Sequence, residues 1–216
     1  MIFRRRGSAD HEPASEPVDT VEPPTSRSRG PWDRSETTAD TDDDSYVDLG
    51  GLIVKGLPGV EIRLEVEEST SLVTAVMLAA PDSGLELRAF AAPRNGSIWD
   101  DVRADIATEA VRHGGTATER DGEFGSELQV VVPVQSPDGR ALSQPSRIVG
   151  VEGPRWLLRG TFFGRSASAP NPDGDMETAF RSVVVVRGEG PMAPREMLAL
   201  RVPPQLTLPA QTDAGQ

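Results

Sequence analysis

The sequence predicts an α+β fold, a mainly antiparallel β-sheet with about two packed α-helices, preceded by a disordered N-terminal arm. Several segments alternate apolar and polar residues, which is typical of half-buried strands. Short turns rich in Gly and Pro join most of these segments, and short turns favour antiparallel pairing because parallel neighbours need long crossovers. Two further segments repeat apolar residues at helical spacing.

The composition divides the chain into an arm, one domain and a tail. Residues 1–45 are rich in Pro, Ser, Thr and acids and contain almost no aliphatic residues after Phe3. Such a segment cannot bury enough apolar surface to offset the entropy of ordering, so we expect a disordered acidic arm. Residues 46–204 are expected to form a single α+β domain, and residues 205–216 a flexible tail.

Two parts of the arm have some functional character. MIFRRR could dock loosely on a membrane surface or an acidic partner, and the alternative is a plain start of a disordered tail. Thr37, Thr38 and Thr41 stand beside acids, where phosphorylation would add charge that an arginine-lined module recognises. The alternative for this second part is a solvated acidic linker.

The first strands are predicted between residues 60 and 91. Residues 60–66 alternate apolar and charged side chains, and residues 72–80 form a nearly continuous apolar run. Residues 85–91 return after the turn Pro81–Gly84, in which Pro presets φ and Gly accepts a positive φ. The last two segments are therefore expected to form an antiparallel hairpin.

The clearest helix is predicted over residues 97–113. Its apolar residues fall on one stripe at spacings of three and four: Trp99, Val102, Ile106 and Ala110. Ser97 is the expected N-cap, with Asp100 in the position of a capping box. His113 suits the negative end of the helix dipole, and Gly114 ends the helix.

Two strand pairs follow, and then a segment that fits two patterns. Residues 116–134 are expected to turn at Asp121–Gly122, and residues 146–152 pair with 155–163. Residues 175–186 have helical spacing, yet their last four residues, all Val, also suit a buried strand. We favour a helix there, followed by a short final strand within residues 197–203.

Residues 155–163, RWLLRGTFF, carry the heaviest aromatic load. As a strand, they direct Trp156, Leu158 and Phe162 into the core and their arginines to the opposite face. We predict that Arg155, Arg159 and Arg165 bind an anion, a phosphate or an acidic peptide, with Arg187, Arg195 and Arg201 close by in the last segment. The alternative is cross-strand ion pairing with Glu61, Glu65 or Glu86.

The composition excludes several classes of chemistry. There is no Cys, which excludes disulfides, thiolate metal sites and cysteine nucleophiles. The net charge of −12 argues against bulk nucleic-acid binding. Neither a phosphate-binding loop nor a dinucleotide fingerprint is present, so we expect no cofactor. No run of 18 apolar residues suggests a membrane span, and a cytoplasmic location is expected.

The remaining polar residues have simpler explanations than catalysis. Histidine chemistry would rest on His113, which we expect to be a dipole partner. The alternation in residues 171–177 resembles a calcium loop, but Met176 replaces its required Gly, and a helix-starting turn accounts for the acids. Asp101 and Asp105 could be paired for acid–base work, and the alternative is a solvated helix face. No metal ligands are therefore predicted.

Two segments carry a resemblance to a known family. GPRWLLRGTFFG and VVVVRGEGPMAPREMLALRVP resemble an actinobacterial family known as domain of unknown function 3710, over about Tyr46–Pro204. The resemblance implies one cytoplasmic domain with a disordered N-terminal arm. It implies no activity, cofactor or catalytic residue.

The function expected from these observations is that of a non-catalytic binding or adaptor module. It would use an arginine-bearing sheet face and the acidic arm to contact a protein partner. The alternative is an enzyme that acts on a small anionic substrate through arginines and carboxylates. A deep pocket that joins Arg159 to two carboxylates would favour the enzyme, and a flat, ion-paired face would favour the binding module.

Overall fold

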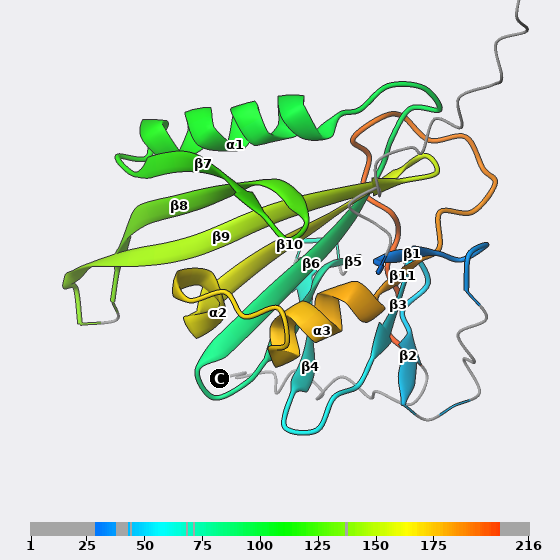
Figure 1. Cartoon of the computed structure of the whole chain (residues 1–216), viewed down its shortest axis with the longest axis horizontal. Coiled ribbons are helices and arrows are strands. Elements are labelled where there is room, and N and C mark those ends of the chain that lie inside the picture. The colour runs from blue at the N-terminus through cyan, green and yellow to red at the C-terminus, as the bar shows by residue number, and fades with distance from the viewer. Residues whose placement is uncertain are drawn as a thin grey trace, which may run out of the picture.

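The computed structural model describes residues 29–37, 43, 45–67, 69–70, 72–136 and 138–203. The predictions for residues 1–28 of the arm, for Thr38 and Thr41, and for the tail over residues 205–216 lie outside these described residues. Within them, the α+β class with mainly antiparallel strands is confirmed (Figure 1).

A seven-stranded antiparallel sheet forms the centre of the molecule, in the order β4-β5-β6-β10-β9-β8-β7. Its strands are β4 (Glu61–Glu67), β5 (Leu72–Ala79), β6 (Ser83–Ala91), β7 (Thr116–Gly122), β8 (Gly125–Gln135), β9 (Ala141–Gly153) and β10 (Trp156–Gly164). Two meanders, β4–β6 and β7–β10, meet where β6 pairs with β10, and helix α1 (Trp99–Arg112) connects them. The predicted β5–β6 hairpin is confirmed.

A second, four-stranded sheet packs beside the first. It consists of β1 (Trp32–Asp33), β11 (Val184–Val185), β3 (Leu52–Lys55) and β2 (Tyr46–Asp48), in that order. Strand β1 pairs in parallel with β11, and Asp33 Oδ2 accepts a hydrogen bond of 2.7 Å from Trp156 Nε1. Trp32 and Asp33, which the sequence assigned to the disordered arm, thus belong to the fold. The sequence pattern did not predict this strand, because two residues are too few to show a periodicity.

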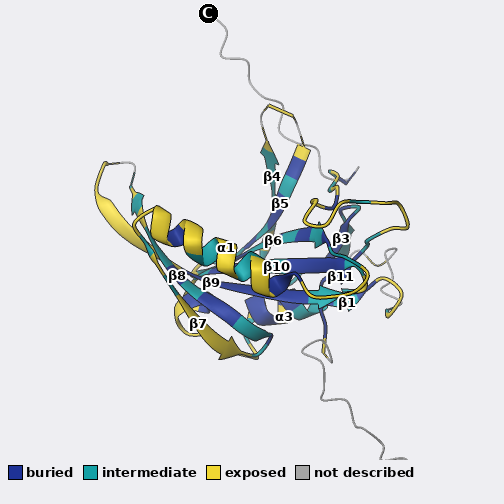
Figure 2. Cartoon of the chain, turned by 90° about the horizontal axis from the view of Figure 1, so that it is seen from above, coloured by how far each residue is buried: buried dark blue, intermediate teal, exposed yellow. Residues whose placement is uncertain are grey.

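The two faces of the large sheet bury separate apolar clusters. Helix α1 covers one face over β7, β8 and β9, and its Trp99 packs with Leu128, Ile148 and Leu157. The other face packs against the small sheet, α2 (Arg165–Ser168) and α3 (Asp175–Ser182), and it contains Trp156, Leu158 and Phe162. Figure 2 shows the buried inner strands between these layers and the exposed outer side of α1. The predicted two-sided strand is confirmed for residues 156–163, with Trp156, Leu158 and Phe162 in one apolar cluster and Leu157 in the other, whereas Arg155 lies in the preceding turn and not on the strand.

Helix α1 begins differently from the prediction. Ile98 occupies the N-cap position, and Ser97 does not cap the helix. The carboxylate of Glu152, at the end of β9, accepts hydrogen bonds from the Ser97 hydroxyl and from the backbone N–H of Ile98, the latter at 2.7 Å. Glu152, which is distant in sequence, therefore accepts the hydrogen bond of a free backbone N–H at the start of the helix, and the Ser97 hydroxyl is a second donor to Glu152.

Three further predictions needed tertiary information. The β7–β8 turn lies at Glu123–Phe124 rather than Asp121–Gly122, because Phe124 is buried with its ring centroid 4.8 Å from that of Phe180. Residues 175–186 contain both predicted alternatives, helix α3 and then strand β11. The final strand within residues 197–203 is reduced to isolated bridges at Met197 and Leu200.

A buried ionic cluster joins α3 to the large sheet. Arg147 of β9 is 1% exposed, and its guanidinium contacts Glu127 Oε2 at 3.4 Å and Glu177 Oε1 of α3. Arg147 Nε also donates to the Ser166 carbonyl at 3.1 Å, and the guanidinium carbon lies 4.0 Å from the ring centroid of Phe162. Desolvation raises the pKa of the Glu127 carboxyl, although Arg147 acts in the opposite direction.

Among the residues that the structure describes, no helix combines the length and apolar character needed to cross a bilayer.

We predict that Gly150→Ala destabilises the fold by about 1–3 kcal/mol, because overpacking forces neighbours to move. A Cβ at this position would lie 2.3 Å from ring atoms of Trp99, so α1 would have to shift. Urea unfolding of the full chain measures the effect. Gly190→Ala is the matched control, because no heavy atom lies within 4 Å of its Cβ position. Equal stability of the two variants would contradict close packing of Trp99 on β9.

We also predict that Glu127→Gln changes how the free energy of unfolding depends on pH. The folded-state pKa of Glu127 is raised, so its contribution to stability is present below the unfolded pKa and is lost as pH rises through the folded pKa. The stability of the Gln variant relative to the native chain should therefore increase as pH rises above the ordinary carboxyl range. Unfolding titrations from pH 4 to 8 test this, and an opposite slope would refute it.

Candidate functional site

The three arginines predicted to bind an anion do not share one site. Arg155 directly precedes β10, Arg159 lies within it, and Arg165 directly follows it. At roughly 3.3 Å per residue, the ends of this strand are on the order of 30 Å apart. Each arginine therefore has its own surroundings.

Arg159 lies in an ion-paired ladder across three strands. Its Nη2 is 3.5 Å from Glu86 Oε1, and the same carboxylate accepts a 2.8 Å bond from Arg88 Nε. Arg88 Nη2 also lies 3.1 Å from Glu65 Oε2. Burial lowers the pKa of Arg159, and the bond to Glu86 raises that of Arg88. This face of the sheet is thus neutralised by cross-strand pairing, the alternative that the sequence offered for Arg159.

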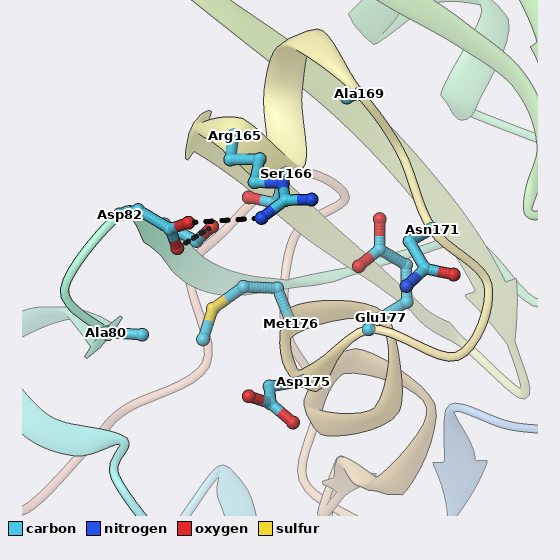
Figure 3. A pocket seen from close by; sticks show the side chains of 11 residues that line it. Ala80, Asp82, Arg165, Ser166, Ala169, Asn171, Asp175, Met176 and Glu177 are labelled. Carbon is cyan, nitrogen blue, oxygen red and sulfur yellow. Dashed lines mark hydrogen bonds and ion pairs between the residues drawn. The ribbon is translucent and has the colours of Figure 1, made fainter.

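Arg165 lines an acidic pocket of about 250 Å³ between the β5–β6 turn, α2 and the start of α3 (Figure 3). Its Nη1 lies 3.7 Å from Asp82 Oδ2, and its side chain is 76% exposed. Asp175 and Glu177 also line the pocket. Carboxylates outnumber the lining arginine, so this pocket does not suit an anion.

The same pocket contains part of the alternation that resembles a calcium loop. Asn171, Asp175 and Glu177 line it, but the Glu177 carboxylate is held by Arg147. Within the described part of the chain, no group of three or more His, Asp or Glu residues is placed to hold a metal ion. The turn at residues 171–174 leads directly into α3.

Arg155 occupies the tight turn between β9 and β10, with φ at 62°. A positive φ is uncommon for a residue with a Cβ. The conformation is held by hydrogen bonds: the Arg155 carbonyl accepts from Ala92 N at 2.8 Å and from Arg187 Nε at 3.1 Å. In return, Arg155 Nη2 donates to the Gly188 carbonyl at 2.9 Å. The Arg187 side chain is thus bonded to the backbone of Arg155, and the Arg155 side chain to the backbone of Gly188, the residue that follows Arg187.

Arg94 joins them from a third segment. Arg94 and Arg155 line one pocket of about 470 Å³ at the β9–β10 turn, together with Ala92, Pro93, Gly96, Ser97, Glu152, Gly153 and Pro154. The lining acid, Glu152, is engaged with Ser97 and Ile98 at the start of α1. We name Arg94, Arg155 and Arg187 the arginine corner.

The arginine corner differs electrostatically from the rest of the surface. Most described arginines pair with a carboxylate, for example Arg63 with Glu61 and Arg201 with Asp48. Among the described residues, no carboxylate lies within 4.0 Å of a guanidinium nitrogen of the corner, although Glu189 is close in sequence and exposed. These three arginines therefore have no ion pair among the described residues, in a chain whose net charge is −12.

Of the arginine corner, the sequence singled out Arg155 and placed Arg187 close by, but it did not single out Arg94. The pairing register of β10 and β6, in which Trp156 pairs with Ala91, would have indicated that Arg94 lies near Arg155. Extending both strands past this pair brings residues 92–94 beside Arg155. Arg147 was also missed, because a buried arginine looks in sequence like any exposed one.

Comparison with known proteins supports the resemblance found in the sequence. No curated protein matches the chain. The family model described as Protein of unknown function (DUF3710) matches residues 30–208, which include β1 as well as the predicted domain. Because this match spans most of its length, the chain belongs to the DUF3710 family.

Proposed function

We propose that this protein is a non-catalytic binding module that recognises an anionic group of a partner at the arginine corner. The observation that carries the proposal is that Arg94 and Arg155 line one pocket, that Arg187 is bonded to the Arg155 carbonyl, and that none of the three has an ion pair with a carboxylate among the described residues. Guanidinium groups present planar forks that match carboxylate and phosphate oxygens. An anion would supply the missing counter-charge.

The corner is organised before any ligand arrives. The Arg155 side chain donates to the Gly188 carbonyl, and the Arg187 side chain donates to the Arg155 carbonyl and, through Nη1, to the Gly190 carbonyl at 3.2 Å. A guanidinium has five N–H donors, so each of these arginines keeps donors that the described chain does not use. Side chains that are already ordered lose less entropy on binding, which supports a recognition role.

The enzymatic alternative has less support. It calls for a pocket that joins Arg159 to two carboxylates, whereas Arg159 belongs to the ion-paired ladder with Glu86. At the corner, the nearby Glu152 carboxylate is committed to the start of α1. In this proposal the acidic N-terminal sequence makes its own partner contacts, and the module works in the cytoplasm.

We predict that Arg155→Gly weakens anion binding by about tenfold to a hundredfold, the equivalent of roughly 1.5–3 kcal/mol for a charge-assisted hydrogen bond. The substitution removes the bond to the Gly188 carbonyl, but the turn should keep its backbone, because Gly adopts positive φ freely and the carbonyl of residue 155 still accepts from Ala92 N and Arg187 Nε. The affinity is measured by titrating the full chain with inorganic pyrophosphate, with calorimetry and the NMR chemical shifts of the backbone amides as the two readouts.

Arg112→Ala is the matched control, because Arg112 is an exposed arginine on α1 that pairs with Glu109. It should bind pyrophosphate as the native chain does. Binding that is absent in the native chain, or that survives unchanged in Arg155→Gly, would refute the proposed site.

A further inference from the structure

Resting on the proposed function, we infer that the partner is an extended acidic peptide that crosses the β9–β10 turn. Its acidic side chain binds the arginine corner, and an apolar side chain enters a second pocket beside Trp99. This identifies the partner's class and adds a second contact surface.

The lining of the first pocket favours a peptide over a nucleotide. Next to the arginines, the pocket is lined by the small or cyclic side chains of Ala92, Pro93 and Pro154, and no aromatic ring lines it. A nucleobase bound at an arginine-rich surface usually stacks on an aromatic ring. The volume of about 470 Å³ is that of a site for several connected groups rather than a single small anion.

A second pocket lies on the other side of the same turn. It measures about 570 Å³ and shares Glu152, Gly153 and Pro154 with the first pocket. Its remaining lining residues are Trp99, Asp100, Arg103, Phe124, Gly125, Ser126 and Gly150. We name it the Trp99 pocket. Because both pockets share lining residues, one extended chain can reach both.

The charges along this surface fix the order of the side chains in the partner. Arg94 and Arg155 line the first pocket alone, and Asp100, which is 79% exposed, lines the Trp99 pocket alone, whereas Glu152 lines both. Arg103, the cation of the Trp99 pocket, is already paired with Asp100 at 3.1 Å. A second acid at the Trp99 pocket would be repelled, while an apolar side chain would meet the edges of buried rings and glycine backbone.

The test uses four probes with the full chain. The first is a ten-residue peptide with two adjacent glutamates and one leucine a few residues away, spaced by Gly and Ser. The second replaces the leucine with serine, the third is pyrophosphate, and the fourth is ATP. Calorimetry gives the affinities. The indole N–H signal of Trp99, which donates to the Ser126 carbonyl at 2.8 Å, reports on the second pocket.

We expect the leucine peptide to bind at least tenfold more tightly than pyrophosphate, ATP or the serine peptide, and to shift the Trp99 indole signal more than those of Trp32 and Trp156. Arg155→Gly should weaken both peptides, and Arg112→Ala neither. If pyrophosphate binds through Arg155 but the leucine peptide binds no better, this inference fails while the proposed function stands. Tighter binding of ATP overturns the peptide class. If none of the probes binds, both proposals fail.

Discussion

The guanidinium of Arg147 holds together the layers of this molecule. It reaches from β9 to Glu127 of β8, to Glu177 of α3 and to the carbonyl of Ser166, all within the buried interior. Loss of one partner from a buried ion pair typically costs about 3–5 kcal/mol, because a charge remains buried without compensation. Here the buried carboxylates of Glu127 and Glu177 both depend on Arg147 to compensate their charge. The ion pair with Glu177 thus ties helix α3 to the sheet, and Phe180 of the same helix packs in the apolar core.

The arginine corner depends on the position of α3 through a short length of chain. Helix α3 ends at Ser182, and β11 follows at Val184–Val185 in the small sheet. The next residues supply Arg187 and the Gly188 carbonyl, which hold Arg155 in its turn. The buried ionic cluster and the pairing of β11 with β1 and β3 thus both help to hold the segment that supplies Arg187 and the Gly188 carbonyl.

The sequence predicts most of the sheet and less of the site, for a physical reason. Alternation and turn chemistry identified the β5–β6 hairpin and both faces of β10, since these depend on neighbours in sequence. Glu152 at the start of α1, the shift of the β7–β8 turn by Phe124, and the burial of Arg147 all depend on partners distant in sequence. Arg159 and Arg155 look alike in the sequence, but register places one beside Glu86 and the other beside Arg187.

The parallel pairing of β1 with β11 also sets an order of events during synthesis. The large sheet lies within residues 61–164, so its strands can pair while later residues are still on the ribosome. Strand β1 is synthesised before the large sheet, whereas its partner Val184–Val185 is synthesised after it. Asp33 can reach Trp156 early, but the backbone of β1 must wait for β11. Such long-range closure is slow, so the small sheet and the arginine corner beside it are assembled at the end of folding.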